Sequence, residues 1–370
     1  MKTFHCDHCG HLVYFENVRC QACDHRLGYL SEPRDMAALE PLADGLWRRA
    51  GPKDDGLRYR MCRNRVEHNV CNWMVAEDDP AELCESCRLT EVIPALDPPG
   101  HRTGWYRMEQ AKRRLLDSLA ALGLRPRGRR EDPQQGLGFH FMADGLPNGL
   151  VLTGHHAGII TLNLAEADDV LRERTRALMG EPYRTLLGHF RHEIGHYYWD
   201  RLFQLAEQRD RFREVFGDER SDYRARLHQH YVWGPPPQWQ KQYISGYASA
   251  HPWEDWAETW AQYLLMVDAL ETARASGLAL MPAHATDPSL GAATGVREAG
   301  GFEALLSRWL ALSYVLNNLH RSLGLPDGCQ IPLGAPVIAK LRFVHGCLQV
   351  LQARPLLQDT VSPRGTSADH

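Results

Sequence analysis

The 370-residue sequence lacks a long apolar run and a strong net charge, and most of its length has no cysteine. Its first residues, MKTFHCDHCGHLVYF, contain no apolar signal-peptide core, and no later stretch approaches the roughly 20 apolar residues that a membrane span needs. We therefore expect a cytoplasmic protein without a membrane partner. The formal net charge of −4 gives no overall attraction to nucleic acid or anionic lipid, so any such contact would have to be local.

Cysteine is concentrated at the start of the chain, where eight of the ten cysteines precede residue 90. Because several form C-x-x-C pairs and no export signal is present, the pattern favours metal ligands over disulfides. The prolines and glycine of VIPALDPPG then mark a linker, after which the composition changes. The length suits two or three domains, and we expect units at 1–30, 31–100 and 101–356, followed by a flexible tail at 357–370.

The first cysteine unit has the regular spacing of a zinc ribbon. Cys6 and Cys9 form one C-x2-C pair, and Cys20 and Cys23 form a second pair after ten intervening residues. Two thiolate pairs on tight turns can complete a tetrahedral Zn²⁺ site, and so short a unit cannot fold on its own core. The sequence therefore predicts a structural zinc ion here, with the neighbouring histidines at the surface.

The second unit is less regular, because only its last pair has the short spacing. Its cysteines are Cys62, Cys71, Cys84 and Cys87, and we expect a second structural zinc ion, with buried free thiols as the alternative. Five arginines could suit phosphate, but four carboxylates lie among them, so we do not expect nucleic acid as a partner. The arginines are Arg58, Arg60, Arg63, Arg65 and Arg88, and the carboxylates are Asp78, Asp79, Glu82 and Glu85. A protein partner for the ribbons stays open.

The remainder reads as an α+β domain in which helices prevail. Two short segments, GLGFHFMADG and GLVLTGHHAGIITLNLAEAD, alternate apolar and turn residues and predict strands, the second with a hairpin turn at 154–158. Segment 281–301 reads as a flexible loop, and Cys329 and Cys347 as buried thiols. Helical spacing of apolar residues predicts helices at about 104–122, 168–179, 183–207, 254–272 and 302–323.

The stretch HFRHEIGHYYWD, residues 189–200, holds the strongest catalytic pattern. His192 and His196 are four residues apart, so on a helix they project from one face and can share a zinc ion. Glu193 is rotated about 100° from His192 and can reach a metal-bound water without ligating the metal. Such a zinc ion polarises a carbonyl and acidifies its water, while the glutamate takes and returns the proton.

A short H-E-x-x-H pattern also arises by chance, so a third ligand is needed. The helical run HPWEDWAETWAQYLLM offers Glu254, Asp255 and Glu258. Glu254 and Glu258 share a face with Ala257 and Ala261, whose small side chains would allow close approach to the first helix, whereas Asp255 points elsewhere.

These motifs resemble those of gluzincin metallopeptidases, in which H-E-x-x-H is followed by E-x-x-A-E. The EDWAE segment is also similar to that of anthrax lethal factor, and the whole chain resembles a bacterial family of predicted zinc-binding metallopeptidases with an N-terminal ribbon. The resemblance implies a zincin-like fold with Glu254 as the third zinc ligand and Glu258 orienting a ligating histidine. It also implies that Tyr247 stabilises the oxyanion, although Tyr243 lies within a modest shift.

The combined prediction is a zinc-dependent peptidase with one catalytic and two structural zinc ions, acting on a peptide or protein. A zincin also needs an edge strand for substrate, for which we expect IITLNL, residues 159–164. Alternatives are a non-catalytic ribbon adaptor with a zincin-like domain and a nucleic-acid-binding ribbon protein. Other expectations place Trp253, Trp256 and Trp260 in the core and His189 beside the site or in solvent. His228 and His230 precede GPPPQW, a loop that could border the cleft.

Overall fold

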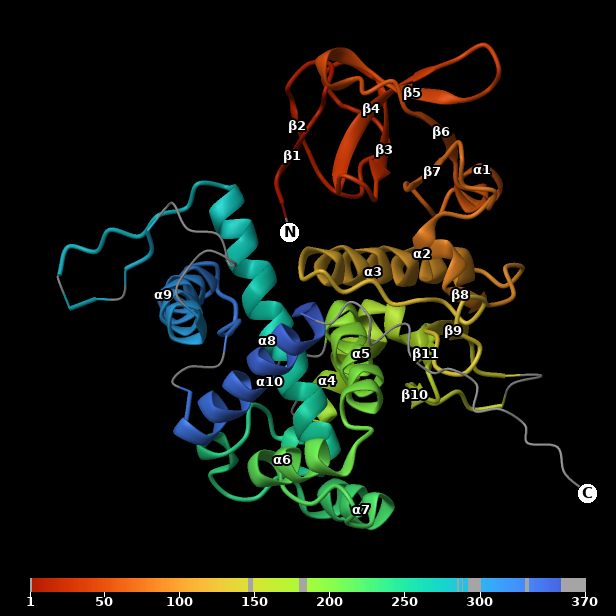
Figure 1. Ribbon diagram of the computed structural model, residues 1–370. Helices are drawn as coiled ribbons and strands as arrows, with labels where there is room; N and C mark the ends of the chain where they lie inside the picture. The colour runs from red at the N-terminus through yellow and green to blue at the C-terminus, as the bar shows by residue number, and fades with distance from the viewer. Residues whose placement is uncertain are drawn as a thin grey trace, which may run out of the picture.

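The chain folds into an N-terminal β-rich part that lies against a mostly helical part (Figure 1). The structure is a computed structural model that describes residues 2–145, 149–179, 185–284, 286–287, 289–291, 301–329 and 333–353. The predicted tail at 357–370 and most of the predicted loop at 281–301 lie outside these residues. The small sheets and prevailing helices confirm the α+β class. Among the described helices, none is both long and apolar enough to cross a membrane.

The N-terminal part contains a two-stranded and a five-stranded antiparallel sheet. The small sheet pairs β1 (Phe4–His5) with β2 (Leu12–Val13). The larger follows chain order, from β3 (Arg26–Leu30) through β4 (Asp35–Pro41), β5 (Trp47–Arg49) and β6 (Arg58–Met61) to β7 (Met74–Ala76). Short helices are η1 (Gly51–Lys53), α1 (Arg63–His68) and α2 (Glu85–Arg88). The expected boundary at residue 30 lies at the end of β3, inside this sheet. The same sheet therefore connects the two cysteine units.

A third sheet lies beside the candidate catalytic helix. Its strand order is β10 (Gly154–His156), β11 (Ile159–Asn163), β9 (Gly138–Met142) and β8 (Thr90–Val92). The expectation that 159–164 is an edge strand is therefore wrong, because β11 pairs with β10 on one side and with β9 on the other. Ala157 and Gly158 have φ of 48° and 83°, as the two central residues of a tight hairpin turn require, and β10 is the edge strand of this sheet.

The helical part contains more helices than the sequence predicts. The predicted helix at 183–207 is shorter, beginning at Leu186 after the Thr185 cap, and is followed by a separate helix. The helices are α3 (His101–Ala121), η2 (Leu164–Ala167), α4 (Asp169–Met179), α5 (Leu186–Leu202), α6 (Ala206–Phe216), α7 (Tyr223–Trp233), η3 (Trp239–Lys241), η4 (Tyr247–Ser249), α8 (Pro252–Ala275), α9 (Gly301–Ser322) and α10 (Ala335–Ala353). Of these, α6, α7 and α10 have no counterpart in the predicted set.

The helices α5 and α8 pack closely around Gly195, the glycine of HEIGH. A Cβ atom added there would lie 3.1 Å from Ala257 Cα and 3.2 Å from Trp260 Cβ. Trp256 Nε1 donates a hydrogen bond of 2.8 Å to the Gly195 carbonyl, which ties the helices together at the same point. This contact brings the histidines of α5 opposite the glutamates of α8.

We expect Gly195→Val to destabilise the fold by about 1–3 kcal/mol, because its branched side chain would press on backbone atoms of α8. The matched control is Gly346→Val in α10, where an added Cβ meets no heavy atom within 4 Å. Denaturant unfolding of both variants measures the difference. Equal stabilities would contradict the close helix contact.

The N-terminal part docks onto α3 and the end of α8. Asp117 of α3, which is 1% exposed, accepts two hydrogen bonds from Arg34, of 2.9 and 3.0 Å, and one from the Tyr29 hydroxyl. Thr3 donates to the Ala275 carbonyl at 3.1 Å. Ala275 ends α8 about 30 Å along the helix axis from Glu254, given the rise of 1.5 Å per residue. These docking contacts are therefore remote from the predicted zinc ligands of α8.

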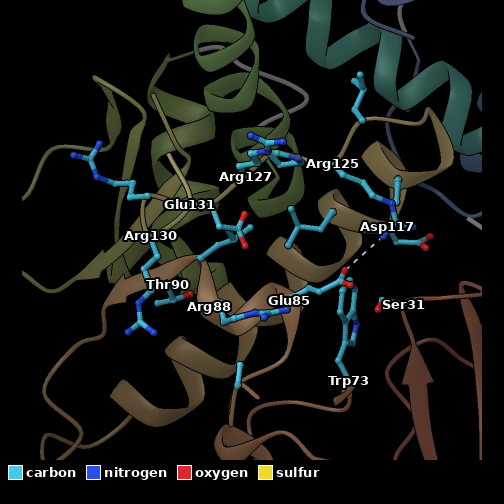
Figure 2. Close-up of a pocket in the computed structure, with 18 of the residues that line it drawn as sticks. Ser31, Trp73, Glu85, Arg88, Thr90, Asp117, Arg125, Arg127, Arg130 and Glu131 are labelled. Atoms are coloured by element: carbon cyan, nitrogen blue, oxygen red, sulfur yellow. Dashed lines mark ion pairs between the residues drawn. The ribbon is translucent and has the colours of Figure 1, made fainter. Parts of the chain in front are cut away.

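A hollow of about 830 Å³ lies at this junction (Figure 2). Arginines and carboxylates both line it, and several of them pair with one another or with nearby groups. Arg125 Nη1 lies 3.6 Å from Glu85 Oε2, and Arg88 Nη1 lies 3.0 Å from Asp79 Oδ2. Because charges of both signs alternate around it, the hollow has no uniform electrostatic preference.

Candidate metal centres

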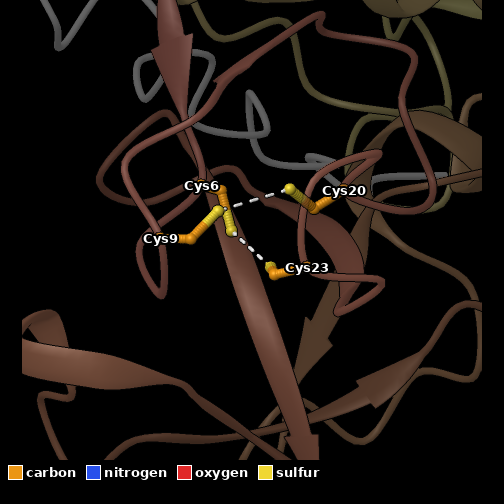
Figure 3. Close-up of side chains that lie close together, drawn as sticks. All are labelled: Cys6, Cys9, Cys20 and Cys23. Atoms are coloured by element: carbon orange, nitrogen blue, oxygen red, sulfur yellow. Dashed lines mark hydrogen bonds between the residues drawn. The ribbon is translucent and has the colours of Figure 1, made fainter.

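The first cysteine unit brings its four thiols together, as Figure 3 shows. Cys6 Sγ lies 3.6 Å from Cys23 Sγ, and Cys9 Sγ lies 3.6 Å from Cys20 Sγ. A disulfide would need about 2.05 Å, whereas a zinc–sulfur bond of about 2.3 Å places two tetrahedral ligands about 3.8 Å apart. The geometry therefore fits a tetrahedral metal ion.

Histidines also lie beside this first unit. The rings of His8 and His25 stack with centroids 3.9 Å apart, and both could approach a metal together with Cys23. His8 is exposed, as expected, whereas His25 is partly buried. Four converging thiols already make a complete ligand set, so these histidines are not needed to complete it.

The second unit also gathers its four cysteines, and all of them are buried. Cys71 Sγ lies 3.6 Å from Cys84 Sγ, and backbone N–H groups of Cys84 and Trp73 donate to Cys62 Sγ and Cys71 Sγ at 3.4 Å. Such N–H groups stabilise thiolates. The four irregularly spaced cysteines thus meet in one compact site because the chain between them folds into α1 and β7.

This second centre is built partly from α3 of the helical part. Arg113 of α3 is buried, donates to the Val70 carbonyl at 2.8 Å and lies close enough to Cys71 to be influenced by its charge. Four thiolates around Zn²⁺ carry a net charge of about −2, which a buried guanidinium compensates. The positive charge of Arg113, from the helical part, therefore offsets negative charge at the four-cysteine centre of the N-terminal part.

The arginines considered for phosphate contact are already engaged. Arg58 pairs with Asp44, Arg63 with Glu82 at 2.6 Å, and Arg88 with Asp79. Arg60 and Arg65 donate to backbone carbonyls of Asp79 and Val18. A nucleic acid would have to displace these partners to reach the guanidinium groups.

The two histidines of α5 and Glu254 of α8 face one another. His192 Nε2 lies 3.1 Å from His196 Nε2 and 3.0 Å from Glu254 Oε2, and His196 Nε2 lies 3.5 Å from the same oxygen. Ligands of one tetrahedral zinc ion would lie about 3.3 Å apart. Two imidazole nitrogens this close repel unless a cation or a proton lies between them. The donor set therefore fits a zinc ion.

Glu258 contacts His192 on the side of the ring opposite Nε2. Its Oε1 lies 2.7 Å from His192 Nδ1, so the ring N–H donates there and Nε2 keeps its lone pair for a metal. Ser245 donates to Glu258 Oε2 at 2.6 Å, which fixes the carboxylate in turn. Nothing in the sequence spacing pointed to Ser245, because its partner lies on a different element.

Glu193 lies buried beside the three metal-binding groups. Burial raises the pKa of its carboxyl to about 7, opposed by His192 and reinforced by Glu254. Its Oε2 has no hydrogen-bond partner among the described residues. By contrast, although burial opposes ionisation of Glu254, the neighbouring His196 and His192 hold its pKa well below the usual value. Glu254 is thus suited to hold a cation, and Glu193 is suited to exchange a proton.

The two tyrosines considered for the oxyanion are separated in space. The ring centroid of Tyr247 lies 6.0 Å from that of His192. Tyr243 instead lies under Lys340 of α10, whose Nζ is 4.3 Å from the ring centroid. The same lysine pairs with Asp255 at 2.6 Å, so Asp255 faces away from the metal ligands, as expected.

Two aromatic residues contact the metal ligands in ways that sequence analysis missed. The Tyr223 hydroxyl donates to Glu254 Oε1 at 2.7 Å. The Trp253 ring centroid lies 3.7 Å from that of His196, so the expectation that Trp253 belongs to the core is wrong, whereas Trp256 and Trp260 are fully buried. Trp253 lies in the first turn of α8, where its ring packs against His196 of α5.

The remaining histidines lie around these groups without joining them. His189 Nδ1 lies 3.3 Å from Glu166, and the His155 side chain is buried with its pKa lowered to about 3, chiefly by burial. His230 lies with its ring centroid 5.8 Å from that of Tyr247, whereas His228 is exposed. Both lie on α7, which ends at Trp233, directly before the loop GPPPQW.

Comparison with known proteins agrees with these observations. A family model described as "Putative zinc-binding metallo-peptidase" matches residues 101–347, and a zinc-ribbon model matches residues 3–98. The chain belongs to this zinc-binding metallopeptidase family. Proteins named as uncharacterized in Mycobacterium bovis and in two strains of Mycobacterium tuberculosis are 42% identical over 346 residues, covering 93% of this chain and 94% of theirs. No solved structure matches.

Proposed function

We propose that the protein is a zinc-dependent peptidase of the gluzincin type. The observation that carries the proposal is the convergence of His192 Nε2, His196 Nε2 and Glu254 Oε2 beside a buried Glu193, whose Oε2 has no hydrogen-bond partner among the described residues. Three protein ligands leave a fourth position open, as in catalytic zinc sites. Zinc in such a site would acidify water and polarise a carbonyl.

The side chains divide the remaining tasks among them. Glu193 takes a proton from the attacking water and returns it to the leaving amine, for which a pKa near 7 is well suited. Tyr247, whose pKa is raised chiefly by burial, keeps its O–H and can donate it to the oxyanion that forms at the substrate carbonyl. Glu258 holds His192 in the tautomer that leaves Nε2 free.

The substrate proposed is a peptide or protein, and the compartment is the cytoplasm. Support for the compartment comes from the cysteines, none of which forms a disulfide in the described chain. The edge strand β10 is short, and an extended peptide could pair with it. The two four-cysteine centres are proposed to hold structural zinc ions.

Elemental analysis of the purified protein is expected to give three zinc ions per chain, and His192→Ala is expected to give two. His284→Ala, an exposed histidine far from these groups in sequence, serves as control and should keep three. Incubation with a peptide library, read by mass spectrometry, should show cleavage by wild type and control only. Two zinc ions in the wild type, unchanged in His192→Ala, would refute the catalytic centre.

A further inference from the structure

We propose that Tyr223 is a positioning residue that sets the orientation of the Glu254 carboxylate for metal binding. Its hydroxyl donates to Glu254 Oε1 at 2.7 Å, while Oε2 of the same group faces both histidine Nε2 atoms. One oxygen is thereby occupied and the other is directed at the metal position. The inference rests on the proposed zinc site and adds a residue that no H-E-x-x-H or E-x-x-A-E pattern contains.

Burial makes this hydrogen bond important. Glu254 is 1% exposed, and a buried carboxylate is costly unless its oxygens have partners. A phenol ordinarily has a pKa of about 10, so the Tyr223 hydroxyl keeps the proton that it donates at neutral pH. Without the hydroxyl, Oε1 would lose this donor, and the carboxylate could rotate or turn both oxygens toward the metal.

The hydroxyl reaches Glu254 because the start of α7 is fixed to the start of α8. Asp222 caps α7 by accepting from Ala225 N at 3.0 Å, and His251 Nε2 donates to the Ser221 carbonyl at 3.1 Å. The Tyr223 ring contacts His251 and Trp253 edge-on, with centroids 5.2 and 5.8 Å away. None of the residues of α7, all of which are described, is buried, so these contacts hold its N-terminal end in place.

The test is Tyr223→Phe, which removes only the hydroxyl oxygen. We expect the third zinc ion to bind about 10- to 100-fold more weakly, as when a group that orients a metal ligand is lost. Competition with a chromophoric zinc chelator measures this affinity, and the two four-cysteine ions provide an internal reference. Tyr243→Phe is the matched control, because the Tyr243 ring contacts Lys340 and not Glu254.

A second measurement separates positioning from a general structural effect. Thermal unfolding is followed with three zinc ions bound and after mild chelation that removes only the weakest ion. If Tyr223 only positions Glu254, wild type and Tyr223→Phe should unfold at the same midpoint temperature after chelation. Binding of the third zinc ion should then raise the midpoint temperature less in Tyr223→Phe than in wild type. If Tyr223→Phe binds the third zinc ion with wild-type affinity, this inference is refuted and the proposed function is unaffected. A wild type that binds only two zinc ions would overturn the proposed function, and this inference with it.

Discussion

Glu193→Gln is expected to retain three zinc ions and to lose peptide hydrolysis by roughly 10²- to 10⁴-fold, the usual contribution of a general base. The amide has nearly the same shape as the carboxyl group but cannot accept the proton of the attacking water. Glu193 Oε2 has no hydrogen-bond partner among the described residues, so replacing this oxygen breaks no hydrogen bond there. Zinc content and cleavage of a peptide substrate found in the library are measured on the same sample.

The control for this variant is Glu207→Gln in the first turn of α6, an exposed glutamate. It should cleave at the wild-type rate. Cleavage at that rate by Glu193→Gln would exclude Glu193 as the base. If wild type and both variants hold three zinc ions and none cleaves any peptide, the non-catalytic adaptor becomes the better description of the protein.

Cys84→Ser is expected to lose one structural zinc ion and to destabilise the N-terminal part by several kcal/mol, because metal binding contributes directly to folding in such units. Cys84 is 1% exposed and lies 3.6 Å from Cys71 Sγ. The effect should extend to α3, since Arg113 would lose much of the negative charge that compensates its own. Elemental analysis and denaturant unfolding measure the two changes.

Cys329→Ser is the matched control, because Cys329 is also a buried thiol but has no cysteine partner among the described residues. It should keep the wild-type zinc content and lose about 1 kcal/mol or less from burying a hydroxyl in place of a thiol. If Cys84→Ser behaves like this control, the second unit is a set of buried free thiols rather than a zinc site.

Local spacing predicted which residues lie together within one element, whereas the pairing of Glu254 and Glu258 with the histidines was implied by the resemblance to gluzincins. Two histidines four apart on a helix must share a face, and two C-x2-C turns can close one tetrahedral site, whatever surrounds them. Glu254 and Glu258 are likewise one helical turn apart, and the structure places both against His192. A shared helix face or a shared turn follows from the geometry of a single element, so it can be predicted directly from the sequence.

The tertiary structure alone decided how separate elements meet. Tyr223 and Ser245 contact Glu254 and Glu258 across 31 and 13 residues of chain, and no periodicity links them. The position of β11 inside the sheet depends on parallel pairing with β9, which only long-range folding can set. The contact of Arg34 with Asp117, through which the N-terminal part docks, likewise joins residues that are far apart in the sequence. The sequence by itself determined the metal-binding chemistry, whereas packing between elements decided which partners orient each ligand.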